Sequence, residues 1–107
     1  MIKNLDRINI IKREMVKKSA EIASKCPYID RIVVFGSSVR NDCRENSDID
    51  FVFFPSAYYK EHKLEYIRTL ERITEVCEYN TDMLRADMLT DNMMNHVMET
   101  GVTVYEG

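Results

Sequence analysis

The chain has 107 residues, of which 45% are hydrophobic, and its formal net charge is −3 at neutral pH. This length suits a single domain over residues 1–107 with one modest core, and the acidic balance argues against direct nucleic-acid binding, which usually needs a basic face. Apolar runs are too short to span a bilayer, and the first 15 residues lack the apolar core of a signal peptide, so we expect a cytoplasmic protein.

The N-terminal part of the chain is predicted to form one amphipathic helix over residues 3–25, which Pro27 stops. Apolar residues recur there at steps of three and four, and Ser19 is the weak position of the series. The stripe expected to face the core is Leu5, Ile8, Ile11, Met15, Ser19 and Ile22. The basic cluster is interpreted as a solvated helix face rather than a binding patch, and it comprises Lys12, Arg13, Lys17 and Lys18.

Residues 31–54 carry the pattern around which the chain is organised. The apolar run 32–35 predicts a short buried strand, and Gly36, Ser37 and Ser38 follow it directly. Glycine lets the backbone turn sharply and approach a ligand closely, and the free N–H groups at a helix start favour an anion. We therefore expect a phosphate-binding turn at this point.

A second strand is predicted to begin at Asp48 and to carry Asp50 on the same face, because side chains alternate along a strand. The opposite face, which is expected to pack, takes Ile49, Phe51 and Phe53. Two carboxylates so close repel each other when both are ionised, and a divalent cation is the usual compensation because hard cations take oxygen ligands. A phosphate-binding turn beside this pair is the geometry that a nucleoside triphosphate with magnesium requires.

Gly36-Ser37, ten intervening residues and then Asp48-Ile49-Asp50 resemble the signature of the DNA polymerase beta-type nucleotidyltransferase superfamily. The short chain resembles the minimal nucleotidyltransferase branch, whose members are antitoxin partners of HEPN-type RNase toxins. The resemblance implies a polymerase beta-like α+β fold, a small mixed β-sheet with helices packed against it. One departure is Asn41, where relatives often carry glycine; asparagine tolerates a left-handed backbone better than most residues.

Two arginines of the signature loop, Arg40 and Arg44, have two interpretations. A guanidinium suits phosphate oxygens, so either side chain could meet a triphosphate, and Arg40 is the stronger candidate for nucleotide binding. Alternatively, both pair with acidic neighbours such as Asp42 and Glu45, or lie in water. The sequence leaves this choice open.

The next helix is predicted to follow Pro55-Ser56, with Ser56 as its cap, and to end near Glu78. Its expected buried stripe is Leu64, Ile67, Leu70, Ile73 and Val76 or Cys77. A last helix is predicted to begin at Thr90 or Asp91 and to end at Gly101. Its stripe is Leu89, Met93 and Val97 with Met94 and Met98, and residues 102–105 form a final strand.

Between these helices, residues 79–84 are predicted to form a third strand, on which Asp82 shares a face with Asn80 and Leu84. The resemblance implies a third carboxylate in this strand, which completes the metal-binding group and acts as general base toward the acceptor hydroxyl. Asp82 is the matching position. Asp87 is the rival, although it lies where the strand should be ending.

The function that the resemblance implies is Mg²⁺-dependent transfer of AMP from ATP to a hydroxyl, on a tyrosine of a HEPN-type toxin. The residues implied to hold two metal ions and to catalyse transfer are Asp48, Asp50 and Asp82. Those implied to bind the nucleotide are Gly36, Ser37 and Arg40. Two alternatives remain: an antitoxin that acts by binding alone, and a nucleotidyltransferase subunit that modifies a small molecule such as an aminoglycoside. A homo-oligomer is compatible with the pattern.

Overall fold

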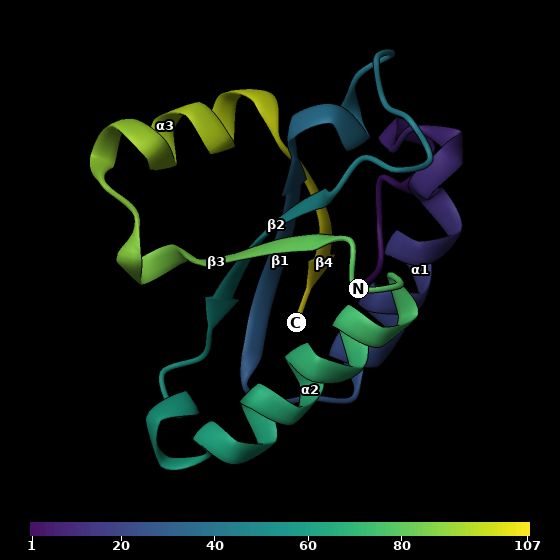
Figure 1. The fold of residues 1–107 in the computed structure, drawn as a ribbon. Coiled ribbons are helices and arrows are strands. Elements are labelled where there is room, and N and C mark those ends of the chain that lie inside the picture. The colour runs from purple at the N-terminus through teal and green to yellow at the C-terminus, as the bar shows by residue number, and fades with distance from the viewer.

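A four-stranded mixed sheet forms the centre of the molecule, with α1 and α2 on one face and α3 on the other (Figure 1). The computed structural model describes residues 1–107. Its α-helices and strands are α1 (Ile10–Ser24), β1 (Ile29–Phe35), β2 (Ile49–Pro55), α2 (Lys63–Val76), β3 (Thr81–Arg85), α3 (Asp91–Thr100) and β4 (Val102–Glu106). The strand order is β3-β2-β1-β4, in which β1 is antiparallel to both neighbours and β2 is parallel to β3. The predicted α+β class and element order are confirmed.

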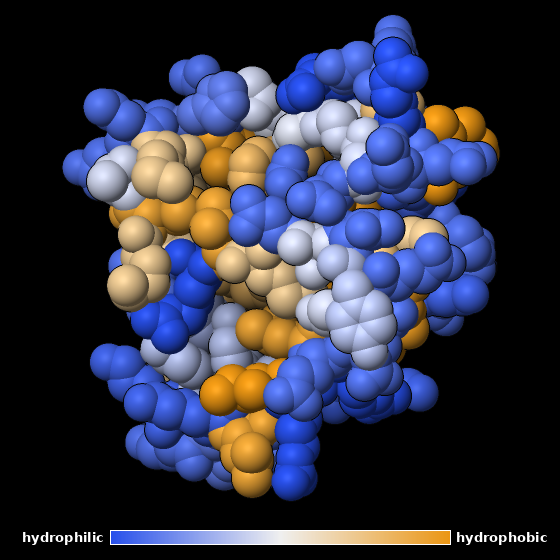
Figure 2. All heavy atoms as spheres, in the orientation of Figure 1, coloured by the Kyte–Doolittle hydropathy of each residue, from blue (hydrophilic) through white to orange (hydrophobic).

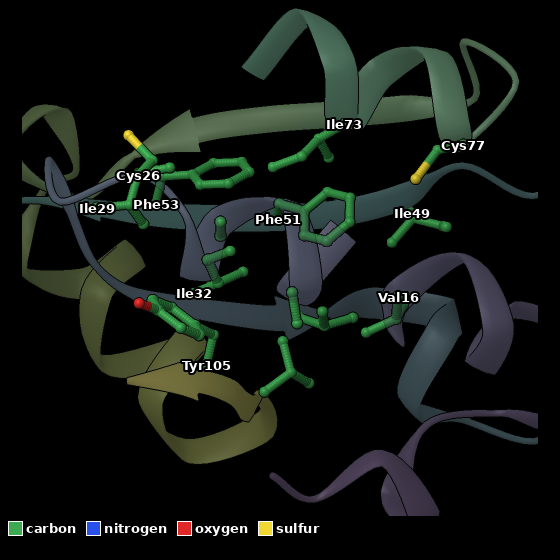
Figure 3. Packing of buried hydrophobic residues seen from close by; sticks show 14 of the residues in the cluster. Val16, Cys26, Ile29, Ile32, Ile49, Phe51, Phe53, Ile73, Cys77 and Tyr105 are labelled. Carbon is green, nitrogen blue, oxygen red and sulfur yellow. The ribbon is translucent and has the colours of Figure 1, made fainter. Parts of the chain in front are cut away.

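Strand β2 alternates between two hydrophobic clusters, as the sequence predicts. Ile49, Phe51 and Phe53 are at most 1% exposed and belong to the larger cluster, which lies between the sheet and the pair α1 and α2. Figure 3 shows the two phenylalanine rings grouped with Ile73 of α2. Full burial of side chains of this size stabilises the fold by about 1.5–3 kcal/mol each, so this face anchors β2 at the centre of the sheet.

The opposite face of the sheet packs under α3. Val52 of β2 and Val97 of α3 lie in the smaller cluster, and Phe54 and Leu84 pack against it. Helix α3 begins as predicted, because the hydroxyl of Thr90 accepts a hydrogen bond from the Met93 N–H at 3.2 Å. The apolar part of this face holds the carboxyl-terminal halves of β2 and β3, and the aspartates occupy its other end.

Helix α1 begins at Ile10, so the prediction of one helix from residue 3 is wrong. The side chain of Asn9 caps α1 by accepting a hydrogen bond from the Ile11 N–H at 3.0 Å, and a separate turn of 3-10 helix, η1 (Leu5–Arg7), precedes it. The buried residues of α1 are Lys12, Val16, Ser19, Ala20 and Ala23. The predicted stripe therefore holds in part: Ile8 and Ser19 are buried, and Leu5, Met15 and Ile22 pack against the core, whereas Ile11 is 42% exposed.

The interpretation of Lys12 as part of a solvated face is also wrong. Its side chain is 1% exposed, and its ammonium donates a hydrogen bond to the Glu45 carbonyl at 2.7 Å. Lys17 and Lys18 are exposed, as predicted. The pattern of charges within the helix could not reveal that Lys12 is buried, because the carbonyl that it binds lies 33 residues further along the chain.

Helix α2 begins at Lys63, and Ser56 does not cap it. The Ser56 hydroxyl instead accepts a hydrogen bond from the Tyr58 N–H in the preceding turn. Tyr66 and Ile73 are buried, whereas Leu64 and Ile67 are 60% and 48% exposed, so the predicted stripe holds only in part. Figure 2 shows the resulting hydrophobic surface over the first part of α2. A bulky aromatic residue at position 66, packed on the Tyr59 ring, turns that side of the helix inward.

Strand β3 begins at Thr81, two residues later than predicted. Glu78 and Tyr79 have φ angles of 57° and 64°, so the chain reverses there in a left-handed turn. Tyr79 is consequently 73% exposed. In none of the three α-helices are the length and hydropathy sufficient for a membrane crossing.

Candidate active site

Asp48, Asp50 and Asp82 all lie at the amino-terminal ends of β2 and β3. The strand register pairs Asp50 with Asp82 across β2 and β3, and pairs Phe35 with Asp50 across β1 and β2. Gly36 follows Phe35 directly and opens a short 3-10 helix, η2 (Gly36–Val39). The backbone thus brings the glycine turn, Asp50 and Asp82 side by side, although they lie far apart in the sequence. Asp48 precedes the first residue of β2.

Gly36 is required at this place for two physical reasons. Its φ angle is +74°, in the left-handed region that side chains other than glycine rarely adopt. A Cβ atom on this residue would also lie 2.1 Å from the Asp50 Oδ2 atom. The carboxylate of Asp50 therefore occupies the space that the missing side chain leaves, in direct contact with the turn.

The site is electrostatically strained. Partial burial raises the pKa of Asp50 above its ordinary value, and the charges of Asp82 and then Asp48 raise it further. Arg40 acts in the opposite direction and lowers it. The charges of Asp82 and Asp48 are therefore close enough to repel that of Asp50.

This strain predicts that Asp50→Asn melts at the same temperature as the wild type or higher. Because the pKa of Asp50 is raised, the folded protein keeps this proton at pH values where the unfolded chain has released it. The contribution of Asp50 to the free energy of unfolding should thus fall as pH rises from the ordinary aspartate range through the raised pKa. Melting curves of both proteins between pH 3 and 8, without divalent cations, measure this effect. A strongly lowered melting temperature at pH 7 would mean that the charged carboxylate is structural instead.

The donor set fits a hard cation that is shared with a phosphate ligand. No three acidic, histidine or cysteine side chains converge closely enough in the structure to form a metal site on their own. Mg²⁺, however, is commonly held by one or two carboxylates together with substrate phosphates and water. Asp48 and Asp50, beside the turn at Gly36, match that second arrangement.

Arg40 is paired with a neighbour in the structure. Its Nε atom lies 3.0 Å from the Asp42 Oδ1 atom, and the hydrogen bond and charge of the guanidinium lower the pKa of Asp42. Both side chains are more than half exposed, so the pair contributes little to stability. The guanidinium can therefore exchange Asp42 for a phosphate at small cost. Arg44 forms no ion pair.

Two further residues of the loop add detail to the predicted turn. Asn41 does not have a positive φ angle, so the position where relatives often carry glycine is not left-handed here. Ser38 is completely buried, and its hydroxyl has no hydrogen-bond partner. Ser37, the predicted phosphate ligand, remains half-buried and accessible.

Asp87 lies away from the other carboxylates. It belongs to the short 3-10 helix η4 (Ala86–Met88), which follows the carboxyl-terminal end of β3, and it pairs with Arg85. At about 3.3 Å per residue, β3 separates it from Asp82 by roughly 10 Å or more. The structure thus brings Asp82, and not Asp87, next to Asp50.

The family model for polymerase beta nucleotidyltransferases matches residues 17–107. The chain belongs to this family. The matched segment contains the glycine turn, β2 and β3, and hence every carboxylate of the site. No curated protein matches the sequence.

Several solved structures share the fold at low sequence identity. A candidate minimal nucleotidyltransferase is 19% identical, with 94% of this chain and 95% of that chain covered and a TM-score of 0.67. A chain from the complex of tri-AMPylated Shewanella oneidensis HEPN toxin with MNT antitoxin is 13% identical, with coverages of 90% and 73% and a TM-score of 0.60. A chain of a toxin–antitoxin structure with AMP-PNP is 14% identical, with coverages of 88% and 73% and a TM-score of 0.61. These likenesses establish the polymerase beta-like fold of the chain.

Proposed function

We propose that this nucleotidyltransferase family member transfers AMP from ATP to a tyrosine hydroxyl of a HEPN-type toxin, and so acts as an antitoxin. The observation that carries the proposal is the position of Asp50, in contact with the turn at Gly36 on one side and paired with Asp82 on the other. A phosphate held by the turn would face carboxylates from two strands. Few arrangements other than nucleotide chemistry explain so much negative charge beside an anion-binding turn.

Each residue of the site has a separate role in this proposal. The backbone at Gly36 and the hydroxyl of Ser37 bind the β- and γ-phosphates, and Arg40 leaves Asp42 to join them. Asp48 and Asp50, with Asp82 at the rim, would hold Mg²⁺, and such an ion would supply positive charge beside the triphosphate. The carboxylate of Asp82 takes the proton of the acceptor hydroxyl, whose oxygen then bonds to the α-phosphorus. The bond between that phosphorus and the bridging oxygen to the β-phosphate breaks, and pyrophosphate leaves.

The partner is proposed from the structures that the chain resembles. One of them is a complex in which the HEPN toxin carries three AMP groups, and another contains the ATP analogue AMP-PNP. These statements describe those proteins, and the shared fold supports extending them to this chain.

Nucleotide binding is expected to require a divalent cation. Without one, the phosphates of ATP would meet the charges of Asp48 and Asp50 unscreened, and binding should be too weak to detect by calorimetry. With 5–10 mM Mg²⁺ or Mn²⁺, a measurable affinity should appear. Titration of ATP into the protein, in magnesium and then in EDTA, tests this directly. Equal affinity in both conditions would contradict the role assigned to the paired aspartates.

The decisive experiment for the function is label transfer. Purified protein is incubated with magnesium, ATP labelled at the α-phosphate, and purified HEPN-type candidate partners, and the label on the partner is identified by mass spectrometry. AMP on a tyrosine is the expected product. If the protein blocks the toxin without transfer, it acts by contact alone. Transfer to an aminoglycoside but not to a protein would reassign the acceptor.

A further inference from the structure

The first turn of α1 is attached to the signature loop at its beginning. The Asn9 backbone N–H donates to the Ser38 carbonyl at 2.7 Å, and the Asn9 side-chain amide donates to the Arg40 carbonyl at 2.8 Å. The same side chain caps α1 through its oxygen, which accepts from the Ile11 N–H. One residue therefore fixes both the start of the helix and the end of η2, directly after Gly36 and Ser37.

Lys12 attaches α1 to the later part of the same loop. Its ammonium donates to the Glu45 carbonyl at 2.7 Å, three residues before Asp48, and no salt bridge accompanies this contact. Removing an ammonium from water is costly unless hydrogen bonds compensate. An apolar residue would fill this position on the buried stripe, with Val16 and Ala20, at no such cost. The charge at Lys12 is therefore better explained by the loop than by the core.

Residues 40–48 contain neither helix nor strand, so few internal contacts determine their shape. The Ser47 N–H donates to the Arg44 carbonyl, and the Arg44 N–H donates to the Ser47 hydroxyl, both at 3.0 Å. This small turn lies immediately before Asp48. Besides the buried side chain of Cys43, the hydrogen bonds from Asn9 and Lys12 thus connect the loop to α1.

We propose that Asn9 and Lys12 are positioning residues, which hold the phosphate-binding turn and the start of β2 at the spacing that a nucleotide needs. They act through the backbone of the loop and do not touch the ligand. Both precede residue 17, where the match to the family begins, so the family pattern does not account for them. The identity of the ligand rests on the proposed function, whereas the attachment of the loop does not.

Two substitutions isolate these contacts from the stability of the fold. Lys12→Met keeps the length and apolar stem of the side chain and removes the donor; replacing a buried charge by an apolar group often leaves stability unchanged or higher. Asn9→Ser keeps a good neutral helix cap and removes the amide donor to the Arg40 carbonyl. Lys17→Met, at an exposed position of the same helix, is the control for loss of positive charge.

The measurements are amide hydrogen exchange without nucleotide, affinity for Mg²⁺ with AMP-PNP, and melting temperature. In both variants, the hydrogen-bonded loop amides of Arg40, Arg44 and Ser47 should exchange about tenfold faster while those of β1 and β2 do not change. Affinity should weaken about tenfold, the factor for one lost hydrogen bond to a charged or buried group. The melting temperature should stay within a few degrees of the wild type, and Lys17→Met should match the wild type throughout.

Three results would overturn the positioning role or separate it from the function. Unchanged loop exchange and affinity in both variants would mean that the contacts are incidental. Parallel loss of melting temperature and of protection across the whole sheet would mean that Lys12 and Asn9 serve the fold in general. If the wild type binds no AMP-PNP, the proposed function fails, and loop exchange in the nucleotide-free protein alone decides whether the two residues hold the loop.

Discussion

Gly36→Ala should abolish nucleotide binding, the largest single effect on affinity that the structure predicts. The new Cβ would lie 2.1 Å from the Asp50 Oδ2 atom, so the carboxylate must move away from the turn. The φ angle of +74° is also unfavourable for alanine, at a cost of about 1–2 kcal/mol. Calorimetry with Mg²⁺ and AMP-PNP measures the affinity, and thermal unfolding monitored by circular dichroism measures the stability.

The two physical causes in Gly36→Ala can be distinguished. The backbone cost alone should lower the melting temperature by several degrees and leave the protein folded. The displaced carboxylate should affect binding alone. Gly107→Ala is the control, because the nearest heavy atom to its Cβ would lie at 3.2 Å and its φ angle is not in the left-handed region. Normal affinity in Gly36→Ala would mean that no phosphate approaches this turn.

The sequence was sufficient to predict those structural features that depend on interactions between residues close together in the chain. The alternation around Phe51 follows from strand geometry, and the Gly36 turn and the caps of α3 follow from the backbone preferences of a few residues. These features were predicted correctly. The order of the predicted elements indicated the small mixed sheet, and the resemblance to the family added its polymerase beta-like arrangement.

Features that depend on distant contacts were predicted wrongly or remained undecided. The buried position of Lys12 depends on the Glu45 carbonyl, and the start of α1 depends on Asn9, whose side chain serves the helix and the loop together. Asp82 was chosen over Asp87 from the resemblance, and its place beside Asp50 depends on the parallel register of β2 and β3, which no local pattern contains. The predicted buried stripe of α2 was wrong in part for a related reason. Tyr66 is buried against the ring of Tyr59, which lies in another segment, and the apolar spacing within α2 does not contain that contact.

Asp82→Asn should separate the transfer reaction from nucleotide binding. Asp82 is exposed on the edge strand β3, where it pairs with Asp50. The three heavy atoms nearest to a Cβ at Gly36 all belong to Asp50, and none belongs to Asp82. An acceptor hydroxyl can therefore reach its carboxylate from solvent. Loss of a general base typically reduces a rate by about 10²–10⁴-fold. Affinity for ATP with Mg²⁺ should stay within about threefold, because the proposed function assigns phosphate binding to Gly36 and Ser37 and metal binding chiefly to Asp48 and Asp50.

Asp87→Asn is the matched control for this experiment. It removes the same charge from the next aspartate along the chain and breaks only the exposed pair with Arg85, so transfer and affinity should both equal the wild type. Initial rates of AMP transfer to the partner, measured at saturating ATP for the wild type and both variants, give the comparison. Normal transfer in Asp82→Asn would exclude this residue as the base. If transfer is lost in Asp87→Asn instead, the acceptor approaches from the carboxyl-terminal end of β3. If neither variant loses transfer, the base must come from the partner protein.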